Sequence, residues 1–224
     1  MAHTLSSPAN VVRSTDAPRP VTRALLAGGV VAGPVFLGAG VAQGLAREGF
    51  GFTRNAISQL ALGDLGWIQV ANFLLTGALV IAGAVGMGRT LHGVPGGAWA
   101  ARLVAVFGAS FLAAAAFPAD AGAGFPVGAP EAASLSAHGA VHMLGGMLGY
   151  LALCAAFLVL ARSLGSLGHH GWALAARLAP AGVLAGFAGS SVSVLAFTVG
   201  AGLGLAGLTA VTARLATTAP QPTH

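Results

Sequence analysis

The chain has 224 residues, of which 56% are hydrophobic and only 7% are charged. Its apolar runs are too long and too numerous for the core of a soluble domain, so the composition predicts a membrane protein. The net charge of +5 results from ten arginines and five acidic residues, and the chain has no lysine. These arginines are spread along the chain, which excludes the clustered basic surface of a nucleic-acid-binding protein.

Five apolar stretches are long enough to cross a membrane, because about 20 residues at about 1.5 Å each span a hydrocarbon layer of about 30 Å. The last stretch, 172–213, would form a helix of about 63 Å, so we expect it to fold back near Gly189–Ser191. The stretches lack the two-residue alternation of barrel strands, and lipid favours helices, whose backbone groups are paired internally.

The sequence therefore predicts an all-α, polytopic membrane bundle with six transmembrane helices. The alternative is five spans, with one long tilted helix and an apolar surface segment at the end. The 35 glycines fit this class, because small residues let membrane helices approach closely. The six expected spans are 24–43, 69–88, 99–117, 139–161, 172–190 and 193–213.

The arginines divide by side under the six-span prediction. Eight border the two termini and the second and fourth loops, whereas Arg47 and Arg54 lie in a loop of the opposite side. Because arginine-rich segments stay in the cytoplasm, we expect the N- and C-termini to be cytoplasmic. We expect a multi-pass protein of the cell (plasma) membrane, which is the inner membrane in bacteria. The expected organisation is a disordered cytoplasmic tail over 1–20, a transmembrane domain over 21–214 and a cytoplasmic tail over 215–224.

The loop between the first two spans carries the signal of a short helix. Ile57, Leu60 and Ala61 share one apolar face, and Asn55 stands before them as a capping residue. Asp64 then lies where an acidic residue favours the start of the next helix. We therefore expect this loop to lie on the outer membrane surface.

The second span contains a stripe of polar side chains. Gln69, Asn72 and Thr76 are spaced at i, i+3 and i+7, which places them on one helix face. Polar groups in hydrocarbon need partners, so we expect this face to meet other helices or a wet cavity.

The third and fourth spans are joined through a second group of polar residues. The third span ends at Phe117-Pro118, since proline disfavours helix in the residue before it, and Asp120 follows. His138 and His142 then stand at i and i+4 on one face of the fourth span. Gly145 and Gly149 continue that line, so this face is expected to pack closely against a neighbouring helix.

Several of these segments resemble the bacterial and archaeal membrane family known as domain of unknown function 998. The similarity lies in Arg54-Asn55-Ala56-Ile57-Ser58-Gln59-Leu60-Ala61-Leu62-Gly63, then Gly66-Trp67, Asn72-Phe73 and Gly77, with Phe117-Pro118-Ala119-Asp120 and His138-Gly139 or His142 further along. It covers about residues 24–213. The resemblance implies a six-helix membrane protein and no particular reaction. Gln59 departs from the pattern, which has an acidic residue there.

The helical hairpin of the third and fourth spans brings Asp120 and His142 to a similar depth. We therefore expect a polar cluster at the outer ends of these helices, with the Asp120 carboxylate within about 8 Å of the His142 ring, close enough for a direct or water-bridged contact. The candidate ligand-binding residues are Asp64, Asn72, Asp120, His138 and His142.

Two histidines at i and i+4 also have the spacing of zinc ligands, and Asp120 would be a third. Zinc is a possible cofactor on this ground alone, and no other cofactor is expected. A metal-dependent intramembrane hydrolase acting on a lipid is one alternative, in which Ser58 or Ser110 would join the aspartate and the histidines, as in certain intramembrane lipid amidases.

Three classes of function remain open. The first is an integral membrane protein with a small outward-facing polar pocket for a lipid-like or small ligand. The second is the lipid hydrolase, and the third is a structural or partner-binding membrane component, in which the polar cluster only stabilises the fold. The expected partners are the lipid bilayer and a lipid or small-molecule ligand, and no nucleic acid is expected. The sequence does not determine the oligomeric state.

Overall fold

The computed structural model describes residues 20–132 and 134–217, and within them it has six long α-helices and one short 3-10 helix, η1. These residues form no β-strand beyond one isolated bridge between Gly122 and Phe125. The elements are α1 (Pro20–Ala46), η1 (Ile57–Ala61), α2 (Gly66–Thr90), α3 (Gly97–Ala116), α4 (Ala137–Ser166), α5 (His170–Gly189) and α6 (Val194–Thr217).

All six α-helices are long and apolar enough to cross a membrane. The predicted all-α fold with six spans is therefore confirmed, and the five-span alternative is wrong, because α5 ends at Gly189 and α6 begins at Val194. Large apolar side chains such as Leu74, Leu148 and Leu178 are at least half exposed on the helix surfaces. An apolar surface of this kind suits lipid contact, as in a multi-pass membrane protein.

The two predicted tails lie almost entirely outside the described residues. Of the first, only Pro20 is described, as the first residue of α1, and of the second only 215–217, as the end of α6. Proline is favourable at this first position, because its missing N–H has no partner within the helix.

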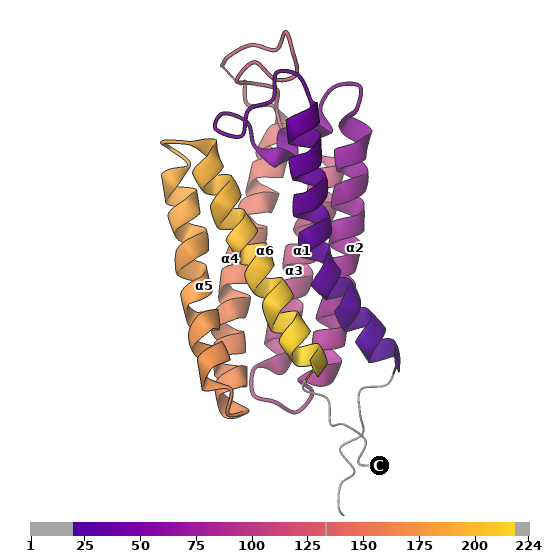
Figure 1. Ribbon diagram of the computed structural model, residues 1–224, viewed down its shortest axis with the longest axis vertical. Coiled ribbons are helices and arrows are strands. Elements are labelled where there is room, and N and C mark those ends of the chain that lie inside the picture. Colours follow the sequence, from indigo (N-terminus) through magenta and orange to yellow (C-terminus); the bar gives the residue numbers. More distant parts are fainter. Residues whose placement is uncertain (1–19, 133, 218–224) are drawn as a thin grey trace, which may run out of the picture.

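The six helices form a closed ring. Each helix packs against its neighbours in the sequence, and α6 closes the ring by packing against α1. Figure 1 shows that the start of α1 and the end of α6 lie at the same end of the bundle. The other end, which we call the η1 end, carries η1 and the α1–α2, α3–α4 and α5–α6 loops.

Glycine pairs set the closest helix contacts in this ring. A Cβ atom added to Gly83 of α2 would lie 2.6 Å from the Cα atom of Gly29 in α1. A Cβ atom added to Gly186 of α5 would lie 2.5 Å from the Cα atom of Gly200 in α6. Backbone lies against backbone at these crossings, so the glycines fill the close-packing role expected of them.

Candidate functional site

The segment before η1 holds the α3–α4 loop in place through Asn55. This side chain is fully buried, with Oδ1 accepting from the Gly51 N–H at 3.0 Å and Nδ2 donating to the carbonyl oxygen of Gly122 at 3.4 Å. The expectation that Asn55 caps the short helix is wrong. The N-cap residue of η1 is Ala56, whose side chain makes no capping hydrogen bond. Asn55 instead joins two loops that are far apart in the sequence.

Gln59 strengthens the same junction. Its Nε2 donates to the backbone oxygen of Asp120 at 3.2 Å, and its Oε1 accepts from the Ala56 N–H at 3.1 Å. A carboxylate at this position would accept but could not donate to a carbonyl oxygen. The glutamine in place of an acidic residue is therefore suited to binding the α3–α4 loop.

An arginine is also fixed at the η1 end. The Arg47 guanidinium donates to the carbonyl oxygens of Leu60 and Leu62, both at 2.7 Å, and lies 4.9 Å from the centre of the Phe125 ring. Its charge is thus engaged with the C-terminal end of η1 and with an aromatic face instead of being presented to lipid headgroups.

Asp120 is bound at the start of α4. Its carboxylate accepts from the Ser136 N–H at 3.0 Å and from the Ser136 hydroxyl at 2.5 Å, and the same hydroxyl accepts from the Gly139 N–H as the α4 N-cap. A Cβ on Gly139 would collide with the carboxylate. The hydrogen bonds from Ser136, aided by attraction to His142 and then His138, hold the pKa of Asp120 below its usual value.

The two histidines take different positions on α4. His138 is exposed, and its ring centre lies 5.6 Å from that of Phe117. His142 is half-buried, and its Nδ1 lies 2.9 Å from the carbonyl oxygen of Phe117. Asp120 attracts the protonated form of either ring, but makes its hydrogen bonds with Ser136.

The remaining predicted site residues lie elsewhere. Asp64 is exposed in the turn before α2, whose N-cap is Leu65. Asn72 is buried and donates to Gln69 Oε1 and to the carbonyl oxygen of Phe36, both at 3.2 Å. The structure thus places Asp120 and the two histidines near one another, but gives Asn72 partners on α1 and α2.

The polar stripe of α2 faces α1, as expected of a face that meets another helix. Gln69, Asn72 and Thr76 are all buried, and Gln43 of α1 donates to Gln69 Oε1 at 2.9 Å. Thr76 donates to Asn72 Oδ1 at 3.5 Å. Because these groups mainly bind one another, they hold α1 against α2.

Gly149 of α4 meets α3, as its place below the histidines predicted. A Cβ on Gly149 would collide with the Ser110 side chain, whereas one on Gly145 would lie 3.7 Å from the nearest carbon, that of Ala113. The histidine face of α4 therefore packs inward, which brings His142 to a cavity inside the ring.

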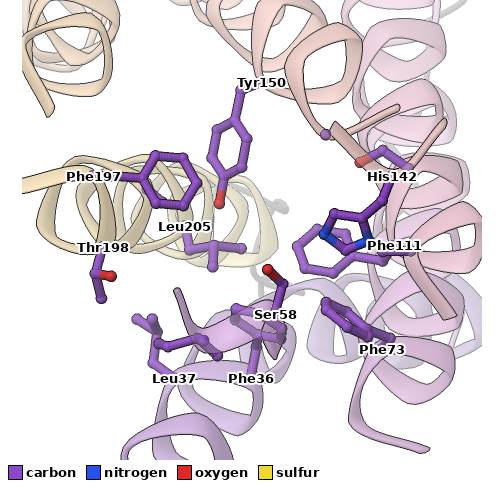
Figure 2. Close-up of a pocket in the computed structure, with 15 residues that line it drawn as sticks. Phe36, Leu37, Ser58, Phe73, Phe111, His142, Tyr150, Phe197, Thr198 and Leu205 are labelled. Atoms are coloured by element: carbon purple, nitrogen blue, oxygen red, sulfur yellow. The ribbon is translucent and has the colours of Figure 1, made fainter. Parts of the chain in front are cut away.

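That cavity has a volume of about 100 Å³, and its lining includes residues of η1 and of the α1, α2, α3, α4 and α6 segments that lie toward the η1 end. Figure 2 shows His142 and Tyr150 reaching the cavity from α4, and Ser58 reaching it from η1. Every element except α5 contributes to its wall. The lining residues are Phe36, Leu37, Ile57, Ser58, Phe73, Ser110, Phe111, Ala114, His142, Gly146, Tyr150, Phe197, Thr198, Ala201 and Leu205. We call this cavity the His142 pocket.

Aromatic rings form much of the pocket wall. The ring centres of Phe36 and Phe111 are 5.1 Å apart, as are those of Phe107 and Tyr150, and the Phe73 ring centre lies 6.3 Å from that of His142. Aromatic pairs at these distances favour one another and hold a wall rigid.

Several polar side chains of the pocket lack protein partners. The Thr198 hydroxyl is buried without a hydrogen bond among the described residues. Within the same part of the chain, the hydroxyls of Ser58 and Tyr150 also make no hydrogen bond to protein. Ser110, by contrast, donates to the carbonyl oxygen of Phe107 at 2.7 Å. The pocket is thus an apolar chamber with a few unfilled polar groups.

Most of these residues were not predicted from the sequence. Tyr150 is the only tyrosine of the chain and stands within an apolar span, which was a usable signal for a polar group inside the bundle. Phe197 and Thr198 gave no such signal, because a phenylalanine and a single threonine are ordinary residues of a largely apolar membrane helix such as α6.

Metal ligands are not assembled here. Among residues 20–132 and 134–217 no group of three or more His, Cys, Asp or Glu side chains is placed to hold a metal ion. Asp120 hydrogen-bonds Ser136, and His142 turns its Nδ1 to a backbone carbonyl. The geometry therefore gives the zinc hydrolase alternative no support.

No curated protein and no solved structure matches this chain. The family described as protein of unknown function (DUF998) matches residues 30–219, which include all of α2 to α6 and most of α1. The segments that carry the resemblance, the one around η1 and the one from Phe117 to His142, meet in the structure at the η1 end. The chain belongs to the DUF998 family of membrane proteins.

Proposed function

We propose that this protein binds a single-chain, lipid-like amphiphile in the His142 pocket. The observation that carries the proposal is the combination of an apolar, aromatic wall with unpartnered hydroxyls at Ser58, Tyr150 and Thr198. Of these hydroxyls that of Thr198 is fully buried, and a buried polar group without a partner costs about 1–3 kcal/mol, which a hydrogen bond to a ligand headgroup would offset. Ligand sites are commonly built this way, mainly apolar with a few placed polar groups.

The pocket volume supports a small headgroup rather than a whole lipid. At about 100 Å³ it is smaller than an engineered apolar cavity of about 150 Å³ that binds benzene. We propose that the polar head and the first carbons of the ligand occupy the pocket, and that the rest of the chain lies in the bilayer. No observation specifically favours a hydrolase or a purely structural role.

We propose further that the η1 end faces the outside of a plasma membrane. The arginines at the opposite end support this orientation, since the positive ends of membrane proteins stay in the cytoplasm. They are Arg23, Arg89, Arg102, Arg162, Arg177 and Arg214.

Orientation is testable with two single cysteines in a Cys154→Ala background. Val127, 67% exposed in the α3–α4 loop, and Ser166, exposed at the end of α4, lie at opposite ends of the bundle. In intact cells an impermeant maleimide should label Val127→Cys, and it should label Ser166→Cys only after the cells are opened. The reverse pattern would show that the η1 end faces the cytoplasm.

The pocket itself is testable by filling it. Gly146 lines the pocket, and a Cβ there would meet no atom within 4 Å, so a leucine side chain can extend into the cavity. In Gly146→Leu, we expect at least a tenfold loss of labelling by a photoactivatable diazirine fatty alcohol, without loss of thermal stability, since leucine is the better helix former. Mass spectrometry of labelled peptides is the measurement, and wild-type adducts should lie in α4 and α6.

A matched control is Gly38→Leu in α1. Gly38 is exposed, and a Cβ there also meets no atom within 4 Å, but it does not line the pocket. This variant should label like the wild type. Labelling that does not saturate in the wild type, or that Gly146→Leu leaves unchanged, would refute ligand binding in the pocket.

A further inference from the structure

We infer that the His142 pocket selects an uncharged amphiphile that bears a hydroxyl group, and that His142 selects it by accepting the hydroxyl hydrogen. The inference rests on the proposed function, because the amphiphile must enter the pocket. It adds the chemical class of the headgroup and the residue that distinguishes it.

The contact with Phe117 determines which nitrogen of His142 carries a proton. A carbonyl oxygen can only accept, so Nδ1 at 2.9 Å must be the donor. In the neutral imidazole Nε2 then has a lone pair and no hydrogen, and can only accept. The Phe117 oxygen is available because it directly follows α3, where the last carbonyls lack helical partners.

Nε2 of His142 is an acceptor that can bind a donor inside the pocket. Within the described part of the chain, His142 makes no hydrogen bond besides the one to Phe117. Figure 2 shows its ring directed into the pocket, where the Ser58 hydroxyl also lies. An alcohol fits both groups, because its hydrogen is donated to Nε2 while its oxygen accepts from Ser58.

The electrostatics of the pocket favour an uncharged headgroup. The residues that line it include no arginine, aspartate or glutamate, so a charged head would lose its hydration without gaining an ionic partner. The nearby Asp120 carboxylate acts electrostatically on His142, which disfavours an anion at Nε2. Asp120 is itself engaged with Ser136, so it does not line the pocket as a partner for a cation.

The test compares three ligands with the same C18 chain. Oleyl alcohol, oleyl methyl ether and oleate are each titrated against the diazirine fatty alcohol on the purified full-length chain at pH 8. The ether keeps the oxygen but lacks the hydrogen that Nε2 would accept. We expect the alcohol to displace the probe at about five- to tenfold lower concentration than the ether, as for one net hydrogen bond. Oleate should be the weakest competitor.

The variant His142→Phe should abolish the advantage of the alcohol. Phenylalanine keeps a ring against Phe73 but has no acceptor, so alcohol and ether should compete equally. Equal competition in the wild type would overturn the inference while leaving pocket binding intact. An advantage that survives in His142→Phe would overturn the role of His142. Failure of the probe to bind saturably would instead refute the proposed function.

A spectroscopic measurement observes the same contact directly in the wild-type protein. In protein labelled with ¹⁵N in the histidine rings, one ring should show an acceptor nitrogen whose signal moves on addition of oleyl alcohol but not of the ether. That signal should be missing in His142→Phe, which assigns it. A protonated Nε2 in the wild type, or a shift of equal size with the ether, would overturn the inference.

Discussion

Replacing Gly83 by leucine should be among the most destabilising single changes in the transmembrane part of this protein. A Cβ at this position lies 2.6 Å from the Cα atom and 3.2 Å from the backbone nitrogen of Gly29. Backbone atoms cannot rotate away as a flexible side chain can, so α1 and α2 must separate. Overpacking of this kind costs about 1–3 kcal/mol or more, and for a chain of this length we expect unfolding about 5–10 °C lower.

Cys154 offers a direct measurement. It is the only cysteine of the chain, and it is buried in α4, so a thiol-reactive fluorophore reacts as the bundle opens. Gly38→Leu is the matched control, because its Cβ meets no atom within 4 Å, and its unfolding temperature should stay within about 2 °C of the wild type. A Gly83→Leu protein as stable as this control would show that α1 and α2 do not pack through this crossing.

The separation of α1 and α2 should also disturb the polar contacts between them. Gln43 reaches Gln69 across this interface, toward the η1 end from the glycine crossing. The polar stripe of α2 was predicted from the sequence, but its partner Gln43 in α1 was not. Gln43 stands alone at the end of an apolar span, so nothing in its local sequence indicates which helix it meets.

Hydropathy was sufficient to predict the six spans, because lipid requires long apolar helices with internally paired backbones. It was not sufficient to predict which residues line the pocket. In a soluble helix the buried face is the apolar one, whereas here both the lipid-facing Leu148 and the pocket-lining Phe197 are apolar. Only polar exceptions mark an inward face, which is why the prediction identified His142 but not the aromatic wall.

Asp120 interacts with the two predicted histidines through its charge, while the predicted distance of about 8 Å to the His142 ring stays a prediction. The helical hairpin brings its charge near His138 and His142, as connected helices require. Its hydrogen-bond donors nevertheless come from Ser136, since α4 begins at Ala137 and the serine before it serves as N-cap. The prediction started the helix at residue 139, so this cap could not be anticipated.

The role of Asn55 could not be read from local sequence either. An asparagine before an apolar turn has the signature of a cap, and its neighbours in the sequence give no reason to expect another role. One of its partners, the carbonyl oxygen of Gly122, lies 67 positions away. A long-range contact of this kind depends on how the two loops meet above the ring of helices.

Asn55→Ala should therefore loosen the whole η1 end. The change leaves the Gly51 N–H without the Asn55 oxygen that it binds, next to a side chain with 0% exposure, while the Gly122 carbonyl oxygen keeps the Phe125 N–H and Gln59 Nε2 as donors. An unsatisfied group of this kind costs about 1–3 kcal/mol, so the loss should be similar in size to that in Gly83→Leu. Unfolding followed through Cys154 measures it, and hydrogen exchange over 117–132 should be faster.

Asn55→Asp distinguishes this hydrogen-bond role from simple packing. Aspartate keeps the acceptor for Gly51 but faces the Gly122 carbonyl with an oxygen in place of Nδ2, and at neutral pH it buries a charge. Burial raises the pKa of such a carboxyl in the folded state above its value in the unfolded chain. The folded protein then binds the proton more tightly, so the loss of stability is largest at pH 7.5 and shrinks as the pH falls through the raised pKa. Asn55→Ala lacks this titration and should show the same loss at pH 5 and pH 7.5.

The exposed Asp64→Asn serves as the control and should have little effect at either pH. If Asn55→Asp were as stable as the wild type at pH 7.5, the Asn55 amide could not be the donor that holds the α3–α4 loop on the bundle.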